Sequence, residues 1–231
     1  MKAATTPTAP AAKSVLSRLQ QGLESLYRVE TRLDVDAFVV GERERGRALA
    51  EREEVKRRPR EQLLVEHAAG EVALGLYLDA EALRNLERHD PGRGLGEHNF
   101  GDFCLAVEGV SHFIYVALCA AADRSVTALE LELQAEVDKF VTCLLLGAAV
   151  AQRSRRLRAR LYDDVRFAED LEGSERARYV TANDQARRYT VALERRYLQH
   201  ERIADMLAEL RRFYRLSLEA KLGHIARATA A

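Results

Sequence analysis

The sequence predicts a helix-dominated α+β protein in which a small N-terminal antiparallel β-hairpin sheet is followed by a bundle of about five C-terminal helices. From residue 102 onward, apolar residues recur at three- and four-residue spacing almost without interruption, which indicates helices. Between residues 61 and 79, two short apolar segments flank a glycine-containing turn, as in a β-hairpin. Strands and helices are therefore segregated along the chain, an order typical of the α+β class.

The composition is consistent with one domain. Of the 231 residues, 47% are hydrophobic, which is enough for a substantial core. Residues 1–13 are rich in Ala, Thr and Pro and lack the apolar segment of a signal peptide, so we expect a disordered tail there. Residues 14–231 are expected to form a single α+β domain, with the sheet and short helices in 14–90 and the helical bundle in 102–227.

The N-terminal part begins with an amphipathic helix over Lys13–Tyr27, for which Ser14 is a plausible cap. The β-branched and aromatic residues between Tyr27 and Val39 then indicate a short strand with a turn. The Glu- and Arg-rich segment 41–60 is interpreted as a solvated helix or a mobile loop.

The hairpin follows over Glu61–Asp79, with Gly70 in its turn. Because the Asp79 side chain can accept hydrogen bonds from free helix N–H groups, we expect it to cap a short helix, Ala80–Arg88. Residues 90–101 contain four glycines and a proline and are predicted to form a loop.

The remainder is predicted to be helical in five segments. These segments are 102–122, 126–152, 154–170, 174–200 and 201–227. Only Asp123-Arg124-Ser125 separates the first two, so they should pack as an antiparallel helical hairpin.

Charge and cysteine content restrict the functional classes. The chain has 36 basic and 36 acidic residues, so its net charge provides no overall attraction to nucleic acid or to an anionic membrane. The three cysteines are dispersed, which favours free thiols in a reducing, cytoplasmic compartment. Glu108 and His112 interrupt the most membrane-like segment, Phe103–Ala122, so no membrane partner is expected.

Polar side chains form stripes on the two helices of the expected hairpin. On the first helix, Glu108, His112, Tyr115 and Cys119 follow one another at four-, three- and four-residue steps. A helix that is apolar on its other sides is normally buried, so this stripe must face polar groups. The facing groups are expected to be three residues of the second helix: Glu132, Glu136 and Lys139.

The favoured interpretation is a buried polar network. His112 is expected to bond Glu132 or Glu136, Lys139 to neutralise another carboxylate, and Tyr115 to complete the set. In that case Glu132, Lys139 and Tyr115 are the binding candidates, and no cofactor is expected. If the site is catalytic instead, its candidate groups are Glu108, His112 and Glu136.

A metal-dependent enzyme is the first alternative. Glu108 and His112 are four residues apart and can reach one ion, and Glu132 and Glu136 can complete its coordination. Three carboxylates with one imidazole suit Fe or Mn better than Zn. Ferritin-type di-iron bundles carry Glu-x-x-His on two helices, whereas this chain has Glu108-x-x-x-His112 once, so no family is assigned.

Nucleic-acid binding is the second alternative, because arginines and tyrosines are interleaved in the C-terminal helices. The set is Arg178, Tyr179, Asn183, Arg187, Arg188, Tyr189, Arg195, Arg196, Tyr197, Arg211, Arg212, Tyr214 and Arg215. Acidic residues are interspersed among them, so we expect ion-paired amphipathic helices rather than a nucleic-acid interface.

The resulting prediction is a cytosolic, non-catalytic binding or regulatory module with an unknown ligand and a buried Glu/His/Lys network at its helical centre. Its partner is expected to be another protein or a second copy of the chain, through the long C-terminal helices. The sequence leaves open whether the protein is an enzyme.

Overall fold

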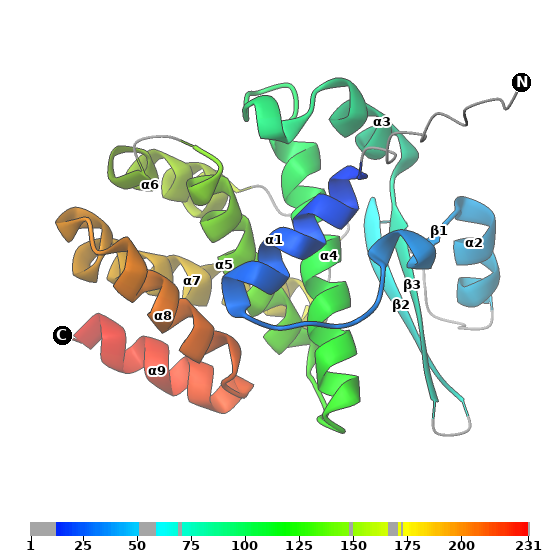
Figure 1. Ribbon diagram of the computed structural model, residues 1–231. Coiled ribbons are helices and arrows are strands. Elements are labelled where there is room, and N and C mark those ends of the chain that lie inside the picture. Colours follow the sequence, from blue (N-terminus) through cyan, green and yellow to red (C-terminus); the bar gives the residue numbers. More distant parts are fainter. Residues whose placement is uncertain are drawn as a thin grey trace, which may run out of the picture.

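The computed structural model describes residues 13–50, 59–68, 71–147, 150–165, 171 and 173–230. The predicted disordered tail, residues 1–13, lies outside this description except for Lys13. At the centre is helix α4 (Phe100–Ala121), which contacts the sheet on one side and the helical bundle on the other (Figure 1). Helix α5 (Ala128–Leu145) packs beside it, so the predicted helical hairpin is confirmed.

Helix α1 (Val15–Tyr27) confirms the first predicted element. The Oγ of Ser14 accepts a hydrogen bond from the Ser17 N–H at 2.9 Å, as an N-cap does. The buried face of α1 packs on α4 and on α8. At its end, the ring of Tyr27 stacks on that of Tyr214, with centroids 4.0 Å apart.

The prediction of a strand after Tyr27 is largely wrong. A 3-10 helix, Val35–Phe38, is followed by the two-residue strand β1 (Val39–Val40). Local side-chain hydrogen bonds explain the difference, since the Val35 N–H donates to Gln20 and the Asp34 carboxylate caps the 3-10 turn. Helix α2 (Glu42–Ala50) begins the charged segment, and residues 51–58 lie outside the described part.

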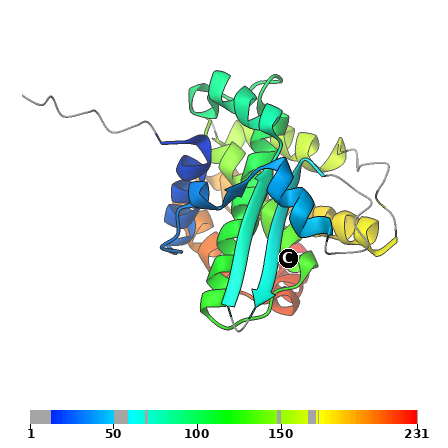
Figure 2. The ribbon, with the colours of Figure 1, turned by 90° about the vertical axis from the view of Figure 1, so that its right-hand side faces the viewer.

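The predicted hairpin is confirmed as β2 (Glu61–Ala68) and β3 (Glu71–Leu78), which pair antiparallel from Glu61↔Leu78 to Ala68↔Glu71. The purely antiparallel sheet is corrected: β1 adds to β3 in parallel, giving a mixed sheet in the order β1-β3-β2. This sheet lies across α4 (Figure 2).

Helix α3 (Ala80–Arg88) has the predicted cap, because the Asp79 carboxylate accepts from the N–H groups of Glu81 and Ala82. The loop after it contains one 3-10 turn, Pro91–Arg93. Asn99, which is buried in this loop, bonds the carbonyls of His89 and Gly94 and brings the chain to the start of α4.

The C-terminal part has more helices than predicted. They are α6 (Val150–Arg158) with a π-helical turn (Ala159–Asp163), α7 (Gly173–Arg196), a 3-10 turn (Leu198–His200), α8 (Ile203–Tyr214) and α9 (Leu218–Ala230). The helix predicted over 126–152 is confirmed as α5, but its predicted end is wrong, since α5 ends at Leu145 and α6 begins at Val150.

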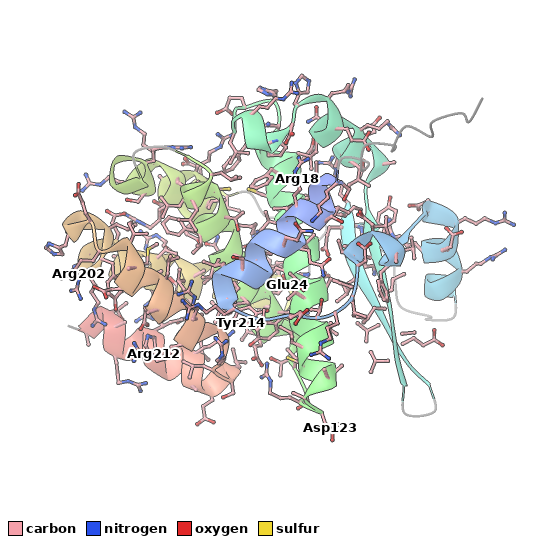
Figure 3. All side chains as sticks on the ribbon, viewed as in Figure 1. Arg18, Glu24, Asp123, Arg202, Arg212 and Tyr214 are labelled. Carbon is pink, nitrogen blue, oxygen red and sulfur yellow. The ribbon has the colours of Figure 1, made fainter. Side chains whose placement is uncertain are left out.

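The helix predicted over 201–227 is also divided, into α8 and α9. An unbroken helix from 203 to 230 would be about 42 Å long at 1.5 Å per residue. The chain reverses instead, so that Phe213 of α8 and Ile225 of α9 are both buried in one core. Tertiary packing thus decides the helix boundary here. In Figure 3, Arg202 marks the start of α8, and Tyr214 at its other end lies against α1.

Helix α4 is long and apolar enough to cross a bilayer by length and composition, and it is the one such helix among the described residues. In this fold, 72% of its most apolar window is buried against other elements. The core helix of a soluble protein meets the same criteria, so this feature does not indicate a membrane location.

Candidate functional site

Lys139 of α5 joins the two helices of the central hairpin. Its Nζ lies 3.0 Å from Oε2 of Glu108 on α4 and 2.7 Å from Oε1 of Glu136, one turn earlier on α5. All three side chains are largely buried. The predicted neutralisation of a carboxylate by Lys139 is confirmed, with two carboxylates instead of one.

His112 lies between two further carboxylates. Its Nδ1 is 3.5 Å from Glu61 on β2, and its Nε2 is 3.7 Å from Glu132 on α5. The Nε of Arg178, on α7, reaches the other oxygen of Glu132 at 3.5 Å. We call these groups the His112 network: Glu61, Glu108, His112, Glu132, Glu136, Lys139 and Arg178.

The sequence interpretation missed two members of this network, Glu61 and Arg178. Both lie on elements far from the helical hairpin along the chain. A signal existed for Glu61, because Leu63 and Val65 follow it at two-residue steps along β2. Residues at this spacing lie on the same face of a strand. No local pattern pointed Arg178 towards Glu132.

Burial and opposite charges determine the protonation of the network. Burial alone would lower the pKa of His112, but Glu61, Glu132 and Glu108 outweigh it and raise this pKa to about 9. Burial raises the pKa of Glu132 to about 7, against the opposing effects of His112 and Arg178. Burial lowers the pKa of Lys139, yet Glu108 and Glu136 bring it well above its ordinary value. At neutral pH, His112 and Lys139 are therefore cations.

The metal alternative has no geometric support among the described residues, where no group of three or more His, Cys, Asp or Glu side chains could hold an ion. Lys139 occupies the position between Glu108 and Glu136 that a cation would need. The charged form of His112 also has no lone pair to give to a metal. The four carboxylates face protein cations instead.

Tyr115 does not belong with His112, contrary to the predicted arrangement. Its hydroxyl donates to Glu130 Oε1 at 2.7 Å, and Arg124 contacts the same oxygen at 2.8 Å. Cys119, the next residue of the stripe, accepts a hydrogen bond from Arg124. The polar stripe of α4 is therefore divided between two separate networks.

The second network is centred on Lys221 of α9, which the sequence interpretation did not select. Its Nζ donates to Tyr115 Oη at 2.9 Å and to Gln134 Oε1 at 2.7 Å. The amide nitrogen of Gln134 donates in turn to Asp138 at 2.8 Å. We call these groups the Lys221 network: Tyr27, Ser111, Tyr115, Arg124, Glu130, Gln134, Asp138 and Lys221.

Asp138 is a buried carboxylate held by three donors. Tyr27 and Gln134 donate to its Oδ1 and Ser111 donates to its Oδ2. Burial raises the pKa of Asp138, and these hydrogen bonds oppose the rise. The donors come from α1, α4 and α5, so the carboxylate links three helices.

The proposed Arg/Tyr interface is only partly present. Tyr189 and Tyr214 are buried, and Tyr189 stacks on Phe213 with centroids 4.1 Å apart. Buried rings cannot stack on bases, so these tyrosines belong to the core. Several arginines of the set remain at the surface of α7.

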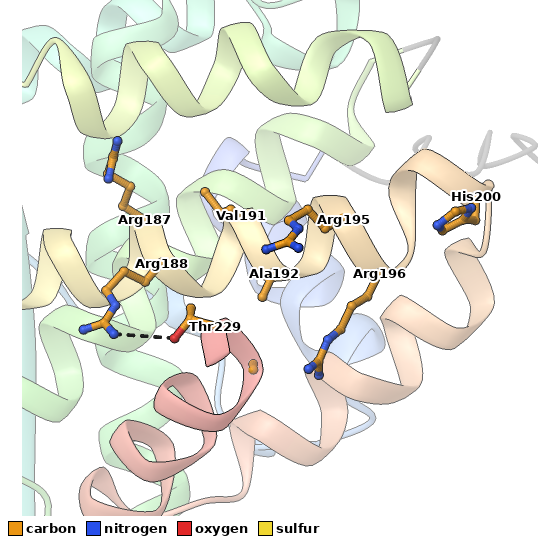
Figure 4. A pocket seen from close by; sticks show the side chains of 9 residues that line it. Arg187, Arg188, Val191, Ala192, Arg195, Arg196, His200 and Thr229 are labelled. Atoms are coloured by element: carbon orange, nitrogen blue, oxygen red, sulfur yellow. Dashed lines mark hydrogen bonds between the residues drawn. The ribbon is translucent and has the colours of Figure 1, made fainter. Parts of the chain in front are cut away.

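Four of those arginines, all on α7, line a hollow of about 480 Å³ between α7 and α9 (Figure 4). We call it the arginine hollow. Its lining consists of Arg187, Arg188, Val191, Ala192, Arg195, Arg196, His200, Ala228 and Thr229. The small side chains Val191, Ala192 and Ala228 leave space beneath the long arginines.

A larger hollow, about 700 Å³, lies between the β-hairpin and the α4–α5 loop. Its lining includes Val72, Val116, Leu131 and Asp123, the last labelled at the end of that loop in Figure 3. None of the His112 network side chains contributes to its lining. The two hollows therefore differ in chemistry, one mainly apolar and one strongly basic.

Comparisons with known proteins provide no identity. No protein-family model, curated protein or solved structure matches this chain. Any functional conclusion must therefore come from the residues of this chain.

Proposed function

We propose that this chain is a non-catalytic binding module that holds a phosphate- or sulfate-like anion in the arginine hollow. The observation that carries the proposal is a cavity lined by four exposed arginines, of which one, Arg187, is paired with an acid. Within the described part of the chain, Asp163 pairs with Arg187 at 2.6 Å, and neither Arg195 nor Arg196 has an acidic partner.

The helical spacing supports this assignment. Residues seven apart lie on nearly the same face of a helix, so Arg188 and Arg195 form one side of the hollow, about 10 Å apart along α7. Arg188 also approaches the Thr229 hydroxyl of α9 at 3.5 Å (Figure 4). Guanidinium groups present paired donors that fit phosphate oxygens, and a site with several of them favours an anion over a neutral ligand.

The His112 network supports a non-catalytic role for the helical centre. The carboxylates of this network are paired with Lys139, His112 and Arg178. We therefore interpret it as a structural connection between β2, α4, α5 and α7. Such networks specify which elements pack together. Association with a partner protein or a second copy, and a cytosolic location, stay predictions.

The test is isothermal titration calorimetry with inorganic pyrophosphate near neutral pH, at low and physiological ionic strength. The wild-type chain should bind with one site per chain, and Arg195→Ala/Arg196→Ala should weaken binding by about tenfold or more, since each charge-assisted hydrogen bond is worth about 1.5–3 kcal/mol. Arg43→Ala/Arg47→Ala removes two exposed arginines of α2 and is the matched control.

Two outcomes would overturn the proposal. One is the absence of pyrophosphate or sulfate binding by the folded wild-type chain at low ionic strength. The other is an equal loss of affinity in the α2 control, which would mean that binding follows total positive charge and not the arginine hollow.

A further inference from the structure

Helix α9 has an unusual packed face. Its buried positions are Lys221, Ile225 and Ala228, at the spacing that places them on one side of the helix. Leu218 and Leu222 pack against the same core while partly exposed, so Lys221 is a buried polar side chain within an otherwise apolar packed face. The same helix contributes Ala228 and Thr229 to the wall of the arginine hollow.

The Lys221 side chain reaches into the core and is 0% exposed. Its Nζ lies 4.5 Å from the ring centre of Tyr115 and 5.2 Å from that of Phe213, in addition to its hydrogen bonds to Tyr115 and Gln134. Both oxygen partners are neutral groups that can accept from an amine or an ammonium group. Among the described residues no carboxylate contacts Nζ directly, so burial of the charged form is only partly compensated.

Charged and titratable groups of several elements lie near Lys221. They are Tyr115 and Cys119 of α4, Arg124 of the loop, Glu130 and Asp138 of α5, Tyr27 of α1 and Tyr214 of α8. Glu130 is engaged by Arg124, and Asp138 by Tyr27 and Ser111. The nearby negative charges are therefore already shared with other donors.

We propose that α9 is a lid on the arginine hollow that is docked when Lys221 is neutral, so that proton uptake by Lys221 favours release of α9 and removal of one wall of the hollow. The inference rests on the proposed function for its ligand, but the movement of α9 can be measured without any ligand. It concerns regulation of the site and not the identity of the anion.

The direction of the effect follows from the two states of the lysine. Burial lowers the pKa of Lys221 to about 7 when α9 is docked, against the opposing effects of Glu130 and Asp138. An undocked, hydrated lysine has its ordinary pKa of about 10.4. Between pH 7 and pH 10, Lys221 is therefore protonated in the undocked form and neutral in the docked form. Because undocking takes up a proton, the undocked population falls as the pH rises across this range.

Two histidines also lie near α9. His224 of α9 contacts Glu209 of α8 at 2.5 Å, and His200 lines the hollow. The experiment compares about pH 7.5 with about pH 9.5, because both values lie between the docked and undocked pKa of Lys221.

The experiment is hydrogen–deuterium exchange on the full chain, with protection factors corrected for the intrinsic pH dependence of exchange. From pH 7.5 to 9.5, protection of the α9 amides should rise by roughly 50-fold. Sulfate, whose charge is constant over this range, should raise α9 protection by about 100-fold at 100 times its Kd. Amides of α3 should show neither effect.

Variants separate the two proposals. Lys221→Met should abolish the pH dependence of α9 protection and keep the response to sulfate, whereas Lys13→Met, at an exposed position, should keep both. Arg195→Ala/Arg196→Ala should lose the sulfate response and keep the pH dependence. If the wild-type chain shows no response to sulfate but keeps the pH dependence, the proposed function is contradicted. If its α9 protection does not change with pH, the lid is contradicted.

A direct titration covers the case in which Lys221→Met does not fold. The chain has five lysines, so the side-chain signals of lysine-labelled wild-type protein can be assigned by NMR. Lys221 should titrate near pH 7. A midpoint near pH 10 would show that the buried lysine keeps its charge and would overturn the inference.

Discussion

The Nζ of Lys139 on α5 lies 3.0 Å from Oε2 of Glu108 on α4, so one ammonium group connects the two central helices. It also contacts Glu136, and the three side chains are mostly shielded from water. Lys139→Met keeps the length of the side chain but leaves two buried carboxylates without their cation. We predict a loss of about 3–5 kcal/mol in the free energy of unfolding, measured by denaturant titration.

The control for this prediction neutralises the acids together with the lysine. Glu108→Gln/Glu136→Gln/Lys139→Met should recover at least half of the lost stability, because no uncompensated charge remains. A loss below about 1 kcal/mol in Lys139→Met would mean that water solvates these carboxylates and that the pair behaves as a surface ion pair.

Local signals explain which parts of the fold were predictable. Ser14 and Asp79 cap α1 and α3 through hydrogen bonds within a few residues, and the β-hairpin follows from its alternating pattern. The parallel pairing of β1 depends on residues about 37 positions away, as Val39↔Leu76 shows, and no local pattern encodes it. The division of the last helix likewise depends on packing around Phe213 and Ile225.

His112 and Lys221 should give the protein opposing pH dependences of stability. The pKa of His112 is raised from 6.5 to about 9 in the folded state, so its stabilisation is complete below pH 6.5 and is lost as the pH rises through 9. The pKa of Lys221 is lowered from 10.5 to about 7, so stability rises with pH across that window. Between pH 7 and 9 the two effects nearly cancel.

Single variants should therefore reveal each effect. From pH 7 to 9, the free energy of unfolding of Lys221→Met should fall by about 2 kcal/mol, and that of His112→Gln should rise by about 2 kcal/mol. Denaturant titrations at both pH values measure this. Parallel pH profiles for the wild type and both variants would contradict the protonation states assigned to these residues.

Lys221 also shows a signal that the sequence interpretation overlooked. Leu218, Lys221, Leu222 and Ile225 occupy positions i, i+3, i+4 and i+7, so the lysine lies within an apolar stripe. A charged residue in such a stripe indicates a buried polar contact. The identity of its partners, Tyr115 and Gln134, depends on tertiary structure and could not be read from the sequence.

Gly109 marks the close contact between α4 and the sheet. A Cβ at this position would lie 3.0 Å from Leu76 Cδ1 and 3.1 Å from Glu61 Cγ. The same substitution at Gly101, also in α4, meets no atom within 4 Å. Gly101→Ala should be neutral or slightly stabilising through helix propensity, and Gly109→Ala should be less stable than Gly101→Ala by about 1–3 kcal/mol.

Thermal and denaturant unfolding of the two glycine variants provide the measurement, with each compared with the wild type. Because Glu61 belongs to the His112 network, displacement of β2 in Gly109→Ala should also lower the pKa of His112 towards its ordinary value. This pKa can be followed by NMR. Equal stability of the two alanine variants would show that the sheet adjusts without cost.

Asp138 provides a test of cooperation among α1, α4 and α5. Ser111→Ala and Tyr27→Phe each remove one donor from a buried carboxylate, and each should cost about 1.5–3 kcal/mol, the value of a hydrogen bond to a charged group. Each loss should also raise the pKa of Asp138 further, since fewer donors stabilise its charged form.

The double variant should be less destabilised than the sum of the single ones, because Asp138 with two donors missing can take up a proton and avoid the cost of an unsolvated charge. A double-mutant cycle by denaturant titration measures this coupling, with the exposed Ser125→Ala as the control. Strict additivity would mean that Asp138 stays ionised throughout and that Gln134, its remaining donor, is sufficient to hold the charge.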